Sequence, residues 1–143
     1  MTNTTALEQF IDVKTEPLLY QIERGAVIKF SSAIDLSFNE NFFNLSDTRT
    51  LTEPVVSPTF FRCLEPNPLP FEFPGTRLLD AGSQWKYFHN TKVGDLITVT
   101  QSLQNTQQKD GRLGTMTFLT IQIEYTNQHS QLVTSQVSTL ISY

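Results

Sequence analysis

Cysteine and histidine are scarce in this sequence of 143 residues, which contains 1 Cys and 2 His. A single thiol, Cys63, cannot form an internal disulfide, and a Cys-based metal site needs several ligands. The two histidines, His89 and His129, lie far apart in the chain and match no metal-ligand spacing. No Gly-rich loop of the kind that holds phosphate groups is present. The sequence therefore predicts neither a metal site nor a cofactor.

Charged residues are also few, and long apolar runs are missing. Asp, Glu, Lys and Arg make up 17% of the chain, the net charge is −4 and the pI is about 5.0. A nucleic-acid binder needs a basic face, so this balance argues against one. No run approaches the ~20 apolar residues that cross a bilayer. The polar start, Met-Thr-Asn-Thr-Thr, has no secretory signal, so we expect a soluble, cytoplasmic protein without a membrane partner.

Aromatic residues supply what the sequence has for a core. There are 11 Phe, 4 Tyr and 1 Trp, and hydrophobic residues make up 38% of the chain. A chain of this length is the size of one domain. We expect a single domain over residues 1–143, in which residues 1–12 form a flexible or helical extension.

The first half of the chain carries the predicted helices. Leu7, Phe10 and Ile11 have helical spacing, and Val27, Phe30, Ala33 and Ile34 form one apolar stripe. Ser57 and Pro58 suit the start of a short helix. These patterns predict helices over 6–13, 26–34 and 57–64, and a strand over 18–22. Four prolines in 65–75 then predict an extended connection over the surface.

The second half alternates with the period of β-strands. Residues 83–89 place Trp85 and Tyr87 on one face, and residues 96–103 resume the alternation after a turn at Gly94. We expect these two runs to pair as an antiparallel hairpin, with Trp85 and Tyr87 facing the core or a subunit interface.

Two further strands are predicted near the end of the chain. They span 113–125 and 132–141, and the polar stretch 105–112 with its Asp110-Gly111 pair is expected to be a loop and turn. Helices followed by an antiparallel meander indicate an α+β fold. We expect a curved sheet wrapped around the helix at 57–64.

Four blocks of sequence resemble a known family. They are Phe30-Ser-Ser-Ala-Ile-Asp, Ser57-Pro-Thr-Phe, Leu79-Asp-Ala-Gly-Ser-Gln-Trp-Lys-Tyr-Phe-His and Val93-Gly-Asp, in that order. Together they look like the N-terminal-type hot-dog domain of MaoC-like dehydratases, and the resemblance extends from about Val13 to Tyr143. The third block together with the Gly-Asp pair is the most specific part.

The resemblance implies a fold, a ligand and a partner. It implies the hot-dog fold, an acyl-CoA or acyl-carrier-protein thioester as ligand, and a unit of two hot dogs, as a homodimer or a hetero-oligomer with another hot-dog subunit. Active family members hydrate an enoyl thioester, or remove water in reverse, with an Asp and a His in a Gly-Asp-x-Asn-Pro-x-His motif. One group takes a proton from water, another protonates the α-carbon, and a backbone N–H polarises the thioester carbonyl.

This sequence departs from that motif. One alignment register puts Asp35 at the glycine, Leu36 at the aspartate and Asn41 at the histidine. Shifting by one residue restores Asp35 as the aspartate but puts Glu40 at the histidine. Because neither register supplies both groups, the resemblance implies a non-catalytic or degenerate subunit that pairs with a catalytic hot dog.

Three titratable residues remain weak catalytic candidates: Asp35, Glu40 and His89. Asp35 could be a buried carboxylate with a raised pKa, or it could accept backbone hydrogen bonds where a helix ends. Glu40 carries the same two interpretations. His89 at a strand end is more often a surface or hydrogen-bonded residue than a base, and His129 is expected to be exposed in a turn.

A group of phenylalanines could line an acyl pocket or pack in the core: Phe38, Phe42, Phe43, Phe60 and Phe61. Cys63 is expected to be buried and inert, because no histidine is placed to activate it.

Two other functions stay open. The chain could be an active hydratase or thioesterase with displaced residues, or a binding or scaffold module that uses the fold without acyl chemistry. Oligomerisation is expected in every case, because an exposed edge strand and apolar flank need cover.

Overall fold

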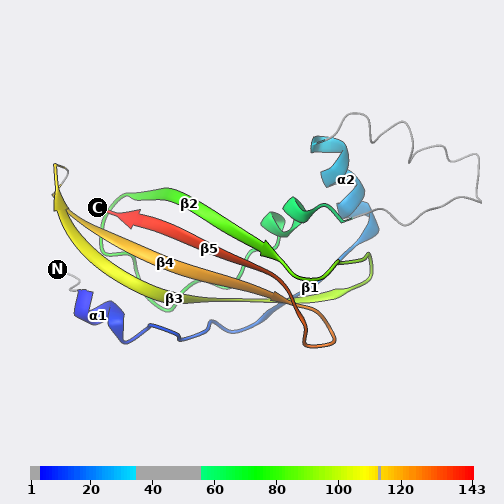
Figure 1. The fold of residues 1–143 in the computed structure, drawn as a ribbon, viewed down its shortest axis with the longest axis horizontal. Helices are drawn as coiled ribbons and strands as arrows, with labels where there is room; N and C mark the ends of the chain where they lie inside the picture. Colours follow the sequence, from blue (N-terminus) through cyan, green and yellow to red (C-terminus); the bar gives the residue numbers. More distant parts are fainter. Residues whose placement is uncertain (1–3, 35–55, 113) are drawn as a thin grey trace, which may run out of the picture.

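The structure, a computed structural model, describes residues 4–34, 56–112 and 114–143. The helical elements are α1 (Thr4–Glu8), α2 (Arg24–Ile34) and the 3-10 helix η1 (Pro58–Cys63). The strands are β1 (Leu18–Gln21), β2 (Leu78–Tyr87), β3 (Leu96–Gly111), β4 (Gly114–Thr126) and β5 (Leu132–Ser142). They form one antiparallel sheet in the order β1-β3-β4-β5-β2 (Figure 1). The α+β class expected from the sequence is therefore confirmed.

Strand β4 shows why the alternating pattern predicted the strands well. Thr117, Leu119, Ile121 and Tyr125 are buried on one face of the sheet, while the residues between them are half-buried. Successive side chains of a strand point to opposite faces, so this alternation sends one apolar row into the core. The neighbours of β4 in the sheet are β3 and β5, which places it at the centre of the core.

The expected hairpin between residues 83–89 and 96–103 is wrong. Strand β2 pairs with β5 instead, and β3 pairs with β1 and β4. After β2 the chain crosses the end of the sheet, where the Phe88 N–H donates to the Val133 carbonyl at 2.9 Å. It then reaches the other edge, where the Gly94 N–H donates to the Ile22 carbonyl at 2.8 Å. The turn at Gly94 does form, with a positive φ of 91°.

Three local expectations also need correction. The polar stretch 105–112 is not a loop, because β3 continues to Gly111 and its Thr106 is buried opposite Leu119. The first helix spans only Thr4–Glu8 rather than 6–13. The helix expected at 57–64 is the short 3-10 helix η1, which directs Phe60 and Phe61 into the core.

Among the described residues, the core consists of two apolar clusters on the same face of the sheet. The first surrounds η1 and joins Phe60, Phe61 and Leu64 to Val27 and Tyr125; Ile22, Ile97, Val99 and Val133 complete it. The second contains Leu7, Leu103, Leu119 and Ile121.

The proline-rich segment 65–75 covers the second cluster. Its Leu69, Phe71 and Phe73 pack against the buried residues, so this segment is more than the surface connection expected from its prolines. The short η1 and this extended segment together cover the face around which the sheet was expected to wrap. The burial of these apolar side chains is the main favourable contribution to the fold.

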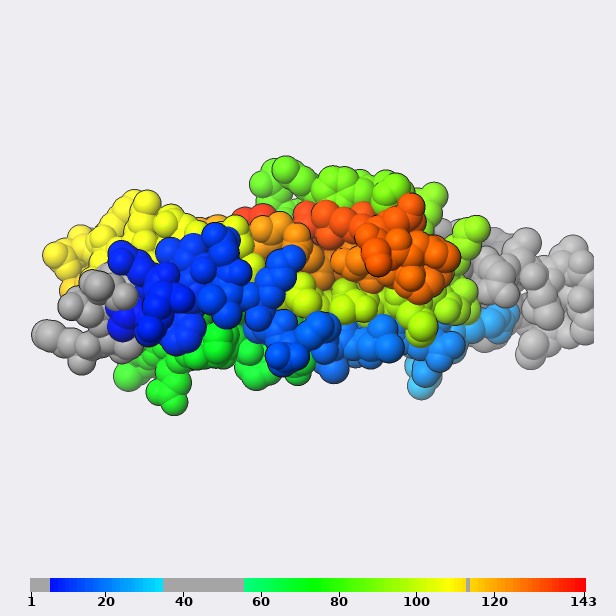
Figure 2. Space-filling model, turned by 90° about the horizontal axis from the view of Figure 1, so that it is seen from below, coloured from blue at the N-terminus to red at the C-terminus, as the bar shows by residue number. Residues whose placement is uncertain are grey.

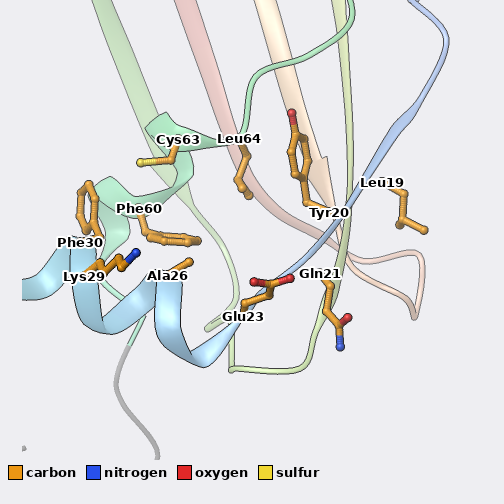
Figure 3. A pocket seen from close by; sticks show the side chains of 10 residues that line it. All are labelled: Leu19, Tyr20, Gln21, Glu23, Ala26, Lys29, Phe30, Phe60, Cys63 and Leu64. Atoms are coloured by element: carbon orange, nitrogen blue, oxygen red, sulfur yellow. The ribbon is translucent and has the colours of Figure 1, made fainter.

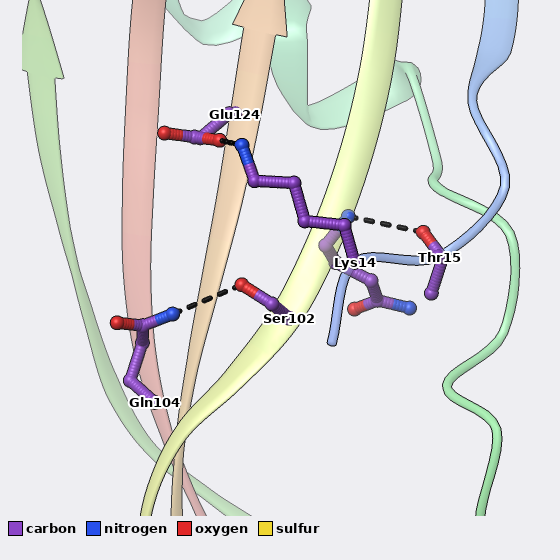
Figure 4. Close-up of polar contacts among 6 residues, drawn as sticks. Lys14, Thr15, Ser102, Gln104 and Glu124 are labelled. Carbon is purple, nitrogen blue, oxygen red and sulfur yellow. Dashed lines mark hydrogen bonds and ion pairs between the residues drawn. The ribbon is translucent and has the colours of Figure 1, made fainter. Parts of the chain in front are cut away.

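The N-terminal segment is attached to the edge of β3 before β1 begins (Figure 4). Thr15 and Gln101 exchange two bonds: the Thr15 N–H donates to the Gln101 carbonyl at 2.9 Å, and the Gln101 N–H donates to Thr15 Oγ1 at 3.1 Å. Lys14 reaches over β3 to form an ion pair with Glu124 of β4. Seen from below, this segment lies along the outside of the molecule (Figure 2).

Candidate functional site

A pocket with a volume of about 620 Å³ lies where β1, α2 and η1 meet (Figure 3). Leu19, Phe30, Phe60 and Leu64 supply most of its apolar wall. The other lining residues are Tyr20, Gln21, Glu23, Ala26, Lys29 and Cys63. Concave, mainly apolar pockets of this size are typical of small-molecule sites.

Two aromatic rings form the wall between α2 and η1. Phe30 and Phe60 meet edge to face, with ring centroids 5.5 Å apart and an interplanar angle of 88°. Phe60 is 5% exposed, so the same side chain lines the pocket and packs in the core. The two interpretations offered for Phe60 from the sequence are therefore compatible, although its role in ligand binding stays a prediction.

The polar lining residues lie on β1, on α2 and the residue before it, and on η1. The Tyr20 hydroxyl donates to the Glu65 carbonyl at 2.8 Å, which ties β1 to the segment after η1. Glu23, which directly precedes α2, and Lys29 of α2 bring one charge of each sign. Cys63 is exposed and lines the pocket, so the expectation that its thiol is buried is wrong. The 3-10 turn directs Phe60 and Phe61 inward, which leaves Cys63 on the outer side.

Of the predicted catalytic candidates, the structure describes only His89, and it does not place this residue at the pocket. His89 is exposed just after β2, and His129 is exposed in the loop between β4 and β5, as expected for both. Neither histidine lines the pocket. Asp35 and Glu40 lie outside the described residues, as do Phe38, Phe42 and Phe43.

Local sequence patterns indicated only part of this pocket. The apolar stripe of α2 correctly placed Val27 in the core and Phe30 beside it, but Ala33 and Ile34 are exposed. The contributions of Leu19, Tyr20 and Glu23 were missed. Nothing in the local pattern of β1 indicates that it lies beside η1, because that contact joins segments about forty residues apart.

A row of aromatic rings extends from the first cluster to strand β2. Trp85 stacks between Tyr87 and Tyr125, with centroid distances of 6.2 Å and 5.9 Å, and Phe61 meets Tyr125 edge to face. Burial raises the pKa of Tyr125 far above its usual value, an effect that the charge of Arg62 partly opposes. Tyr125 is therefore a neutral hydroxyl at ordinary pH.

Strand β2 leaves one edge of the sheet open among the described residues. It pairs with β5 on one side only, and the apolar side chains Leu78, Leu79, Tyr87 and Phe88 at its ends are exposed. Trp85 is half-buried and Tyr87 exposed, so the expectation of a core position is not met for Tyr87, and an interface position stays a prediction. An open strand edge with apolar side chains is a template for pairing with another chain.

The described residues form neither a metal-binding cluster nor a membrane-spanning helix. Among residues 4–34, 56–112 and 114–143, no three His, Cys, Asp or Glu side chains gather closely enough to hold a metal ion. In the same part of the chain, none of the helices has the length and apolar character needed to cross a bilayer.

Comparison with known families gives one match that covers most of the chain. The family model described as the FAS1-like, dehydratase domain region matches residues 9–136. A search of curated protein sequences found no match.

Several solved structures share the fold at low sequence identity. The ChsH1-ChsH2 complex from Mycobacterium tuberculosis matches with a TM-score of 0.73 and 13% identity, over 97% of this chain and 94% of that one. The MaoC-like dehydratase from Rhodospirillum rubrum matches with a TM-score of 0.66 and 14% identity, over 96% and 95%. The (R)-hydratase from A. caviae matches with a TM-score of 0.62 and 17% identity, over 91% and 94%. The hot-dog fold that the sequence resemblance implied is therefore confirmed.

Proposed function

Because the chain belongs to the FAS1-like dehydratase domain region family, we propose that it is the non-catalytic subunit of a hot-dog hydratase or dehydratase that acts on acyl thioesters. In this proposal the chain binds part of the acyl ligand and pairs with a second hot dog that carries the Asp and His. The reaction adds water across an enoyl thioester, with the hydroxyl on the β-carbon and a proton on the α-carbon, or removes it in reverse.

The observation that carries the non-catalytic assignment is the position of the histidines. The chain has 2 His in all, and both are exposed on segments that do not line the pocket. A general acid or base must come within hydrogen-bond reach of the reacting atoms. Neither His89 nor His129 is among the residues that line this pocket, which supports assigning the acid and base to the partner. The pocket instead offers apolar contact from Leu19, Phe30 and Phe60.

The pocket supports a role in holding an acyl group. Its wall is mostly aliphatic and aromatic, and such walls stabilise an apolar chain by removing it from water. Lys29 and Glu23 add polar atoms to the lining that could contact the carrier end of a thioester. A thioester bound here would still need an Asp and a His from the partner.

The open edge of β2 supports the pairing. A partner strand placed there would satisfy unpaired backbone groups and cover Leu79, which is 51% exposed. One structural neighbour is itself a complex of two differently named chains. We assign the partner subunit to this edge.

Enoyl-thioester hydration tests the function directly. The purified chain alone should not consume crotonyl-CoA, followed as loss of the conjugated thioester absorbance, and should gain activity when mixed with a hot dog that carries the intact motif. Turnover by the chain alone would refute the non-catalytic assignment and direct attention to Asp35, Glu40 and His89.

A variant of β2 tests the partner surface separately. Leu79→Lys places a charge at the proposed interface, so association measured by sedimentation should weaken while the circular dichroism spectrum stays unchanged. Val13→Lys is the matched control, because Val13 is also an exposed apolar residue (44%) but lies away from β2. If both variants associate as strongly as the parent chain, β2 is not part of the interface.

A further inference from the structure

On the face of the sheet that carries the apolar clusters, several of the side chains where β2 meets β5 are polar. Ser83 of β2 lies opposite Ser138 of β5, and Trp85 lies opposite Gln136. Gln136 is 1% exposed and its neighbour on the same face, Thr134, is 0% exposed. A buried amide and hydroxyl need hydrogen-bond partners, because both have lost their contact with water.

The nitrogen of the Gln136 side chain has its partners. Gln136 Nε2 donates to Ser83 Oγ at 3.0 Å and to Ser138 Oγ at 2.8 Å. The two serine hydroxyls lie 2.8 Å apart and share a further hydrogen bond. These three bonds join β2 to β5 through side chains as well as through the backbone.

The oxygen of the same amide has none. Neither Gln136 Oε1 nor Thr134 Oγ1 has a hydrogen-bond partner in the part of the chain that the structure describes, and both atoms are fully buried. Rotating the amide by half a turn would instead leave the nitrogen without an acceptor, so the deficit stays in either orientation. Both side chains lie on the same face of β5, two residues apart, so the two unpartnered oxygens lie on the same side of the strand.

We propose that Gln136 Oε1 and Thr134 Oγ1 together bind one buried water molecule. Water fits this position because it donates two hydrogen bonds, needs little space and commonly bridges buried polar groups. By accepting a hydrogen bond from this water, Oε1 is held away from the serines, and Nε2 is directed toward them. The two serine hydroxyls then both accept from Nε2 and share one hydrogen bond with each other.

The water thus fixes the orientation of the Gln136 amide, whose nitrogen joins β5 to β2. This inference does not depend on the proposed acyl ligand, because it rests on buried atoms of β5 and on their hydrogen bonds to Ser83 of β2.

The proposal is tested by comparing how two threonine substitutions change the melting temperature. In the full chain, Thr134→Val removes a hydroxyl but keeps the shape, and losing the water contact should lower the melting temperature by about 2–4 °C. The matched control is Thr106→Val. Thr106 Oγ1 is also buried and unpartnered, but it lies opposite Leu119 in the second apolar cluster. Its replacement should leave the melting temperature unchanged or raise it.

The crystal structure of the full chain supplies the second measurement. A water within hydrogen-bond distance of both Gln136 Oε1 and Thr134 Oγ1 is expected in the parent chain and should be missing in Thr134→Val. The proposal would be overturned by a parent structure without this water, or by a Thr134→Val variant that is as stable as the parent or more so.

Discussion

Phe60 and Phe61 are adjacent in η1, but they face different parts of the molecule, and this difference can be measured. Phe60 lines the pocket and meets Phe30, whereas Phe61 meets Tyr125 with ring centroids 5.1 Å apart and does not line the pocket. They are 5% and 3% exposed. Changing each to Leu therefore separates ligand contact from core packing.

The size of the stability change follows from what each ring loses. A Phe→Ala change in a core removes about 3–5 kcal/mol, which is a large share of the ~5–15 kcal/mol that stabilises a domain. Leu keeps most of the apolar volume but loses an edge-to-face aromatic pair worth about 0.5–1.5 kcal/mol and leaves part of the site unfilled. Phe60→Leu and Phe61→Leu should each lower the free energy of unfolding by about 1–3 kcal/mol.

Ligand binding should separate the two variants. Urea unfolding gives the stability of each, and calorimetric titration with decanoyl-CoA gives the affinity, measured for the chain together with its partner hot dog. Phe60→Leu should change the affinity, whereas Phe61→Leu should leave it near that of the parent. The reasoning would be refuted by an unchanged affinity in Phe60→Leu, or by a loss of affinity in Phe61→Leu as large as in Phe60→Leu.

Two further predictions concern the ends of the sheet and the core tyrosine. A Cβ at Gly75 would lie 2.5 Å from the backbone nitrogen of Tyr143, so Gly75→Ala should lower the free energy of unfolding in urea by about 1–3 kcal/mol. Gly25 in α2 has open space where a Cβ would lie, so Gly25→Ala should leave this free energy unchanged or raise it by up to about 1 kcal/mol. Equal effects of the two would contradict the close approach at Gly75. Burial raises the pKa of Tyr125, so the folded chain holds this proton more tightly than the unfolded chain; stability should be full below the ordinary value near 10 and should fall as the pH rises above it. Tyr125→Phe should reduce this fall in urea midpoints between pH 9 and pH 11, and an unchanged slope would contradict the burial of the hydroxyl.

The sequence determined the local structure where one face of an element is buried. The alternation around Leu119, Ile121 and Tyr125 predicted β4 and the face that it buries, because a strand places every second side chain on the same side. The resemblance blocks identified the fold, and the comparisons confirm it. The missing Asp and His motif gave the non-catalytic hypothesis, which the positions of His89 and His129 support.

Only the tertiary structure decided which segments meet. Local alternation does not specify a strand's partner, so β2 could be predicted as a strand but not as the edge strand beside β5. The exposure of Cys63 depends on η1 being a 3-10 turn, which a proline and an N-cap residue do not distinguish from an α-helix. The pocket and the polar contacts of Gln136 likewise join residues distant in sequence. Pairing between distant segments depends on packing across the whole chain, and for that reason the sequence alone could predict the elements of this protein but not its candidate site.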